Sequence, residues 1–128
     1  MSYYFSKTLN TDWDNAKEKV IASLKTEGFG VLTEIDMKAT LNKKLGVEMR
    51  PYTILGACNP SFAYKAVIAE ENIGTMLPCN VIMQEKKDGQ IEISAVDPVA
   101  SMQAIKNKDL SEIAGEVRDK LQRAIENL

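Results

Sequence analysis

The last twenty residues carry the pattern that most constrains the fold. From Asp109 onward, apolar side chains recur every three or four positions with charged residues between them, which predicts one long helix with a single apolar face. Asp109 and Glu112 have the spacing of a capping box, so we expect Asp109 to cap the helix. Such a helix must bury its stripe against a broad apolar surface, and we therefore expect it to lie across a β-sheet. The stripe consists of Leu110, Ile113, Ala114, Val117, Leu121, Ile125 and Leu128.

Five segments rich in β-branched, aromatic or alternating apolar residues are expected to supply that sheet. They are residues 3–9, 29–35, 50–57, 81–86 and 90–96. Asp88-Gly89 predicts a hairpin with a two-residue turn between the last two strands, because both turn positions must tolerate positive φ. Helical spacing predicts helices over residues 13–27, 37–45, 60–71 and a short one after Asp97-Pro98. The order β-α-β-α-β-α-β-β-α-α predicts a single α+β domain over residues 1–128, with a mixed, mainly antiparallel sheet and helices packed on one face.

Composition removes several classes of function. The chain has 128 residues and a formal net charge of −2, and no basic block or face that would attract a phosphate backbone, so we expect no nucleic-acid partner. No apolar run approaches the roughly 20 residues of a membrane helix, and the first residues lack the apolar core of a secretory signal. We therefore expect a cytoplasmic protein without a membrane partner.

The chain contains no histidine, which excludes Ser-His and Cys-His dyads and histidine-ligated zinc. Its two cysteines are the remaining candidates for chemistry. Cys58 ends a predicted strand, and Asn59-Pro60 after it is typical of a helix N-cap followed by the first helical residue. A helix N-terminus stabilises a nearby thiolate. Cys79-Asn80 opens the next strand, so neighbouring strands would bring the two Cys-Asn pairs to one pocket.

Three interpretations of these pairs stay open. The first is a small-molecule or thiol-ligand binding pocket formed by Cys58, Asn59, Cys79 and Asn80, with Arg50 and Tyr52 as further polar lining. The second is a thiol-dependent enzyme in which Cys58 is the nucleophile and Asn80 donates to an oxyanion. The third is a structural or interaction protein whose cysteines pack in the core. We expect no cofactor and no metal, since methionine is more often core filler than a copper ligand and no zinc spacing occurs.

Four segments together resemble one prokaryotic family, catalogued as domain of unknown function 302. They are EIDMKATLNKKLG, GACNPSFAYKA, IGTMLPCNVIMQE and AVDPVASM, in that order over nearly the whole chain. The resemblance implies a curved antiparallel sheet backed by a long C-terminal helix, similar to the arrangement of the TATA-binding protein. It also implies a homodimer, and it implies no established enzymatic activity. The family motifs match Glu34, Asp36, Cys58, Asn59, Pro60, Gly74, Pro78, Cys79, Asn80, Asp97 and Pro98.

Overall fold

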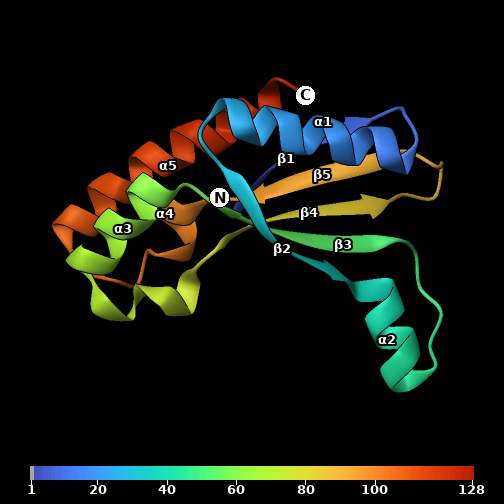
Figure 1. The fold of residues 1–128 in the computed structure, drawn as a ribbon, viewed down its shortest axis with the longest axis horizontal. Helices are drawn as coiled ribbons and strands as arrows, with labels where there is room; N and C mark the ends of the chain where they lie inside the picture. The colour runs from blue at the N-terminus through green and yellow to red at the C-terminus, as the bar shows by residue number, and fades with distance from the viewer. Residues whose placement is uncertain (1) are drawn as a thin grey trace.

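A computed structural model describes residues 2–128 and contains one five-stranded sheet (Figure 1). The strand order is β1-β5-β4-β3-β2, and all four pairings in this sheet are antiparallel. The expected α+β fold and the predicted order of helices and strands are confirmed. The strands are β1 (Tyr4–Leu9), β2 (Gly30–Asp36), β3 (Tyr52–Cys58), β4 (Cys79–Glu85) and β5 (Ile91–Val96).

Two long helices cover one face of the sheet, and two short ones lie beside α5 at one end of it (Figure 1). The helices are α1 (Trp13–Thr26), α2 (Met37–Leu45), α3 (Pro60–Ala69), the 3-10 helix η1 (Glu71–Met76), α4 (Pro98–Ser101) and α5 (Lys108–Glu126). The long C-terminal helix α5 contacts β5, β1, α1, α3 and α4, so its apolar stripe closes the core as predicted. Helix α1 lies beside α5 over the same face.

The core lies between this covered face and the helices. Residues of β3 and β4 that face each other there include Leu55 with Val81 and Ala57 with Cys79. Val20 and Leu24 from α1 and Leu121 from α5 are at most 1% exposed. Because successive strand residues point to opposite faces, the residues between these core positions form the other face of the sheet. Among the helices of residues 2–128, only α2 lies on the side of that open face, where it projects below the sheet (Figure 1).

Helix caps explain where most helices begin. The side chains of Asp12, Asp36 and Asp97 cap α1, α2 and α4, accepting hydrogen bonds from the Asn15, Ala39 and Val99 amides at 2.8–3.0 Å. The predicted cap of α5 is wrong. Asn107 caps this helix, accepting from the Leu110 amide at 3.2 Å while its own amide donates to the Ala69 carbonyl at 2.8 Å. An asparagine has both a donor and an acceptor, so it joins the end of α3 to the start of α5, which Asp109 could not do.

Two local predictions need correction. The predicted helix over residues 60–71 ends at Ala69 and continues as η1. The β4–β5 connection is also longer than two residues, because Glu85 pairs with Ile91 and the Lys86 amide donates to the Gln90 carbonyl at 2.8 Å. In this loop only Gly89 has positive φ, at 81°. The Asp88 side chain instead accepts from the Gln90 amide, so this aspartate shapes the loop by a local hydrogen bond.

Helix α2 projects from the body of the protein, and we call it with the following loop (residues 37–51) the α2 arm (Figure 1). None of its nine helical residues is buried. Leu45 is 71% exposed, and Val47 and the preceding Ile35 are 43% and 45% exposed. Because none of these residues is buried, few contacts within the chain hold the arm in place. An isolated helix of this length is also marginal in water.

Candidate functional site

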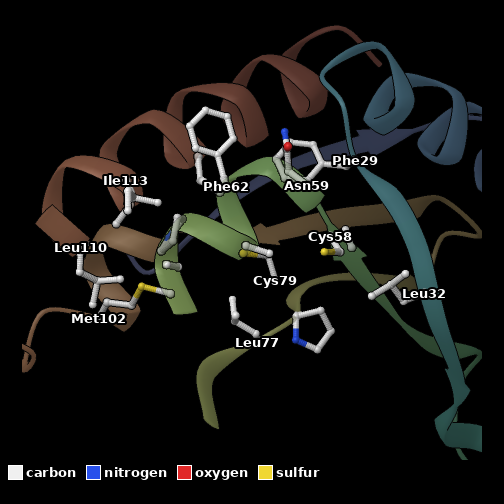
Figure 2. A pocket seen from close by; sticks show the side chains of 17 residues that line it. Phe29, Leu32, Cys58, Asn59, Phe62, Leu77, Cys79, Met102, Leu110 and Ile113 are labelled. Carbon is white, nitrogen blue, oxygen red and sulfur yellow. The ribbon is translucent and has the colours of Figure 1, made fainter. Parts of the chain in front are cut away.

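Cys58 lies where β3 ends and α3 begins, and its side chain lines a cavity between the sheet, α3 and α5 (Figure 2). The cavity has a volume of about 260 Å³. Leu32 on the edge strand β2 also lines it and is 66% exposed. The half-buried Cys58 and this leucine therefore lie on the side where the cavity reaches the surface.

Small side chains on two facing helices create this space. Ala63 and Ala66 on α3 and Ala114 on α5 carry only a methyl group toward the cavity, so the helices do not fill the gap between them. Phe62, Ile113 and further apolar residues complete the walls (Figure 2). Among the residues that line the cavity, none carries a charge, and Asn59 and the two cysteines have the polar side chains. An apolar ligand would therefore bind here more favourably than an ionic group, which would lose its hydration without a partner.

Cys79 lines the same cavity but is buried, with 8% of its surface exposed. Burial and, to a smaller extent, the neighbouring Cys58 together raise the pKa of the Cys79 thiol from 9.0 to about 11. Cys79 therefore stays a neutral thiol at physiological pH, and a neutral thiol is a poor nucleophile. The two cysteines are free, and the structure brings them to one cavity from neighbouring strands.

Asn59 does not cap α3 with its side chain, so the prediction that it acts as an N-cap is wrong in that respect. Its side-chain amide donates instead to the Glu27 carbonyl at 3.2 Å. Glu27 ends α1, and its carboxylate accepts from Arg123 of α5 at 3.0 Å. Asn59 thus ties the start of α3 to the end of α1 beside the cavity, while Pro60 takes the first helical position as predicted.

The other predicted site residues lie elsewhere. Asn80 follows Cys79 directly on β4, so its side chain points to the open face of the sheet. There it lines a second hollow of about 530 Å³ together with Arg50 and Tyr52. The structure therefore divides the predicted site into two places, with Cys58, Asn59 and Cys79 at the apolar cavity. It does not bring Cys58 and Asn80 into one cavity, as the predicted pairing of nucleophile and oxyanion donor requires.

Several residues that line the apolar cavity were not among the predicted site residues. Phe29, Leu77, Met102 and Leu110 come from four separate segments of the chain. Each has the sequence pattern of an ordinary core residue, so no local signal distinguishes it. The run of small residues on α3 is the one feature of the sequence that indicates space beside this helix.

Two further observations concern metal ligands and membrane spans in residues 2–128. Within this range, no three histidine, cysteine, aspartate or glutamate side chains are grouped so that they could hold a metal ion. None of the helices in the same range is both long and apolar enough to cross a membrane.

Comparisons with known proteins identify relatives of the whole fold. The model of the family described as "Domain of unknown function DUF302" matches residues 5–128. A crystal structure of an uncharacterized conserved DUF302 protein from Bacillus stearothermophilus is similar to this chain, with a TM-score of 0.90 and 26% sequence identity. The match covers 98% of each chain. The comparison with curated proteins gave no match.

Proposed function

Given that the chain belongs to the DUF302 family, whose description names no activity, we propose from the site itself that this protein binds a small, largely apolar molecule in the cavity beside Cys58, Asn59 and Cys79. The observation that carries the proposal is a cavity of about 260 Å³ whose lining has no charged side chain. Cavities with an apolar lining accept apolar guests. Cys58 at the exposed side gives the ligand a thiol to contact.

The expected affinity follows from burial. A ligand that buries about 200 Å² of apolar surface gains roughly 5 kcal/mol, and it loses part of that gain through restricted motion. We therefore expect simple probes such as indole or 1-hexanol to bind with dissociation constants of about 0.2 mM to several millimolar.

Thermal unfolding in the presence of indole and 1-hexanol tests the proposal, because a ligand that binds only the folded state raises the unfolding temperature. Ala63→Phe places an aromatic ring into the cavity and should abolish the shift. Ala22→Phe, on an exposed position of α1, is the matched control and should keep it. Equal shifts in both variants, or no shift in the native protein across a series of apolar probes, would contradict the proposal.

Alkylation of Cys58 gives a second measurement at the same site. A bound probe should slow the reaction of iodoacetamide with Cys58, which lies half-buried at the exposed side of the cavity. The same probe should leave the rate unchanged in Ala63→Phe. Site-resolved mass spectrometry separates Cys58 from Cys79, and unchanged Cys58 labelling at saturating probe would place the ligand elsewhere.

We also propose that the protein acts as a homodimer in the cytoplasm. The α2 arm supports the first part, because its exposed apolar residues and its lack of buried ones suit a helix that a second copy covers. Two free thiols suit a reducing compartment. Analytical ultracentrifugation of the native protein and of Leu45→Asp tests the dimer, with Lys44→Asp as the control at the next position. A native protein that sediments as a monomer at high concentration would refute it.

A further inference from the structure

The open face of the sheet carries a second candidate site, which is independent of the apolar cavity. Its hollow of about 530 Å³ is lined by three tyrosines, by Arg50 and Lys86, and by polar or charged side chains of β4 and β5. Tyr3 and Tyr4 are 69% and 41% exposed, and their rings meet edge to face with centroids 5.0 Å apart. Arg50 lies at the base of the α2 arm and lines the same hollow.

The guanidinium group of Arg50 is held in a defined orientation. Its Nε and Nη2 both donate to Oε1 of Gln84, at 3.0 and 2.8 Å. The same group lies over the ring of Tyr52, 5.4 Å from the ring centroid. Gln84 is only 9% exposed and is itself fixed, because its Nε2 donates to Glu92 at 3.2 Å. Three neighbouring strand residues thus fix one arginine side chain on the sheet surface before any ligand arrives.

This arrangement leaves one side of the guanidinium group available. Nε and Nη2 form one of the two donor pairs that a guanidinium presents, and Gln84 occupies it. The second pair, formed by Nη1 and the outer hydrogen of Nη2, has the spacing of the two oxygens of a carboxylate. Arg118 and Arg123 pair with Asp97 and Glu27, whereas within residues 2–128 Arg50 makes no ion pair with a carboxylate. The exposed guanidinium group therefore contacts the neutral oxygen of Gln84 and the ring of Tyr52, and neither contact neutralises its charge.

The remaining lining sets the class of ligand. Lys86 adds a second positive charge to the hollow, and Glu92, which pairs with it at 3.6 Å, is the acidic residue of the lining. Tyrosine rings offer flat apolar surface to a planar body. We propose that the hollow binds a small organic anion in which a carboxylate is attached to a planar, unsaturated or aromatic group. The carboxylate accepts from Nη1 and Nη2 of Arg50 in a bidentate manner, and the planar group lies against the tyrosines.

Benzoate and its neutral isostere benzamide are the probes that test this site. Nitrogen-resolved NMR can follow the Nε–H of Arg50 and the side-chain amide of Gln84 during each titration. We expect benzoate to shift both signals, benzamide to leave them unchanged, and added sodium chloride to weaken the benzoate effect. Arg50→Gln should lower benzoate affinity about tenfold or more, because it removes a charge-assisted hydrogen-bonded pair.

Two matched variants test whether the response to benzoate comes from this site. Arg123→Gln removes an arginine of the covered side and should keep native benzoate affinity. Gln84→Glu keeps Arg50 but places a carboxylate beside it, so affinity should fall as it does in Arg50→Gln. Absence of any shift at Arg50 with benzoate, or an equal response to benzamide, would overturn the proposal.

The oligomeric state of the same samples distinguishes a ligand site from a contact between copies. If Arg50→Gln dissociates a dimer while benzoate leaves Arg50 and Gln84 unshifted, the open face belongs to the interface and the anion site is refuted. Indole and 1-hexanol should not shift the Arg50 signal, because we expect them to bind in the apolar cavity beside Cys58. The anion site and the apolar cavity can thus fail independently.

Discussion

Gly56 on β3 offers a direct test of how tightly the open face is packed at the cavity end of the sheet. A Cβ atom at this position would lie 2.7 Å from Cγ of Pro78 and would collide with the hydroxyl of Thr33. Carbon atoms in contact ordinarily stay about 3.5–4.0 Å apart, so in Gly56→Ala the proline ring must move by roughly 1 Å. Overpacking of this kind costs about 1–3 kcal/mol of unfolding free energy.

Gly115 in the middle of α5 is the matched control. A Cβ atom built there meets no heavy atom within 4 Å, and alanine is favoured over glycine in a helix interior by about 1 kcal/mol. Gly115→Ala should therefore stabilise the protein, whereas the same substitution at Gly56 should destabilise it. The two variants should differ by about 2–4 kcal/mol.

Urea denaturation monitored by circular dichroism, with thermal unfolding beside it, measures this difference. For a domain of this size, 1 kcal/mol shifts the unfolding temperature by about 4 °C, so the variants should melt roughly 8–16 °C apart. If Gly56→Ala is as stable as the native protein while Gly115→Ala gains stability, Pro78 and Thr33 do not pack over Gly56 as described. If both variants lose stability equally, the helix argument fails instead.

Three further predictions concern the thiols and a buried cap. The pKa of Cys79 is about 11 in the folded protein and 9.0 when exposed, so Cys79 ionises first in the unfolded chain as the pH rises. The free energy of unfolding should therefore fall by about 2–3 kcal/mol between pH 9 and 11. Urea titrations at each pH should show that Cys79→Ala lacks this part of the fall. At pH 8, iodoacetamide should label Cys58 well before Cys79, and equal rates by mass spectrometry would contradict the burial of Cys79. Asp97→Ala should lower the free energy of unfolding by about 1–3 kcal/mol, because Asp97 caps α4 through Val99 and pairs with Arg118 at 3.2 Å. Asp97→Asn keeps the cap acceptor and should lose less stability. Equal losses in the two variants would show that the cap does not contribute.

The arrangement of helices and strands could be predicted because each element has its own periodicity. The stripe of α5 and the aspartate caps are local signals, and the structure confirms them. The predicted cap of α5 is wrong because Asn107, the actual cap, is held in place by a hydrogen bond to the end of α3, which lies far away in the sequence. Contacts of this kind leave no mark on the spacing of neighbouring residues.

The candidate site was predictable only in part. Strand alternation alone implies that Cys79 and Asn80 point to opposite faces, so the division of the predicted site follows from a rule that the sequence already contains. The contact between Arg50 and Gln84 depends on the register that pairs Tyr52 with Gln84. That register, like the gap between α3 and α5, is set by packing of the whole sheet.

The strand order also determines when this protein can complete its fold during synthesis. Strand β1 is made first, but in the sheet it pairs only with β5, the last strand to be made. Helix α1 likewise packs on α5, and Ser23 donates to the Ala124 carbonyl. On the ribosome, β1 therefore stays unpaired until β5 has been made, and α1 lacks its contact with α5 until that helix has emerged. Strands β3, β4 and β5 can pair with their sequence neighbours earlier. Chaperones that shield nascent apolar segments should accordingly engage β1 and α1 until β5 and α5 have been made.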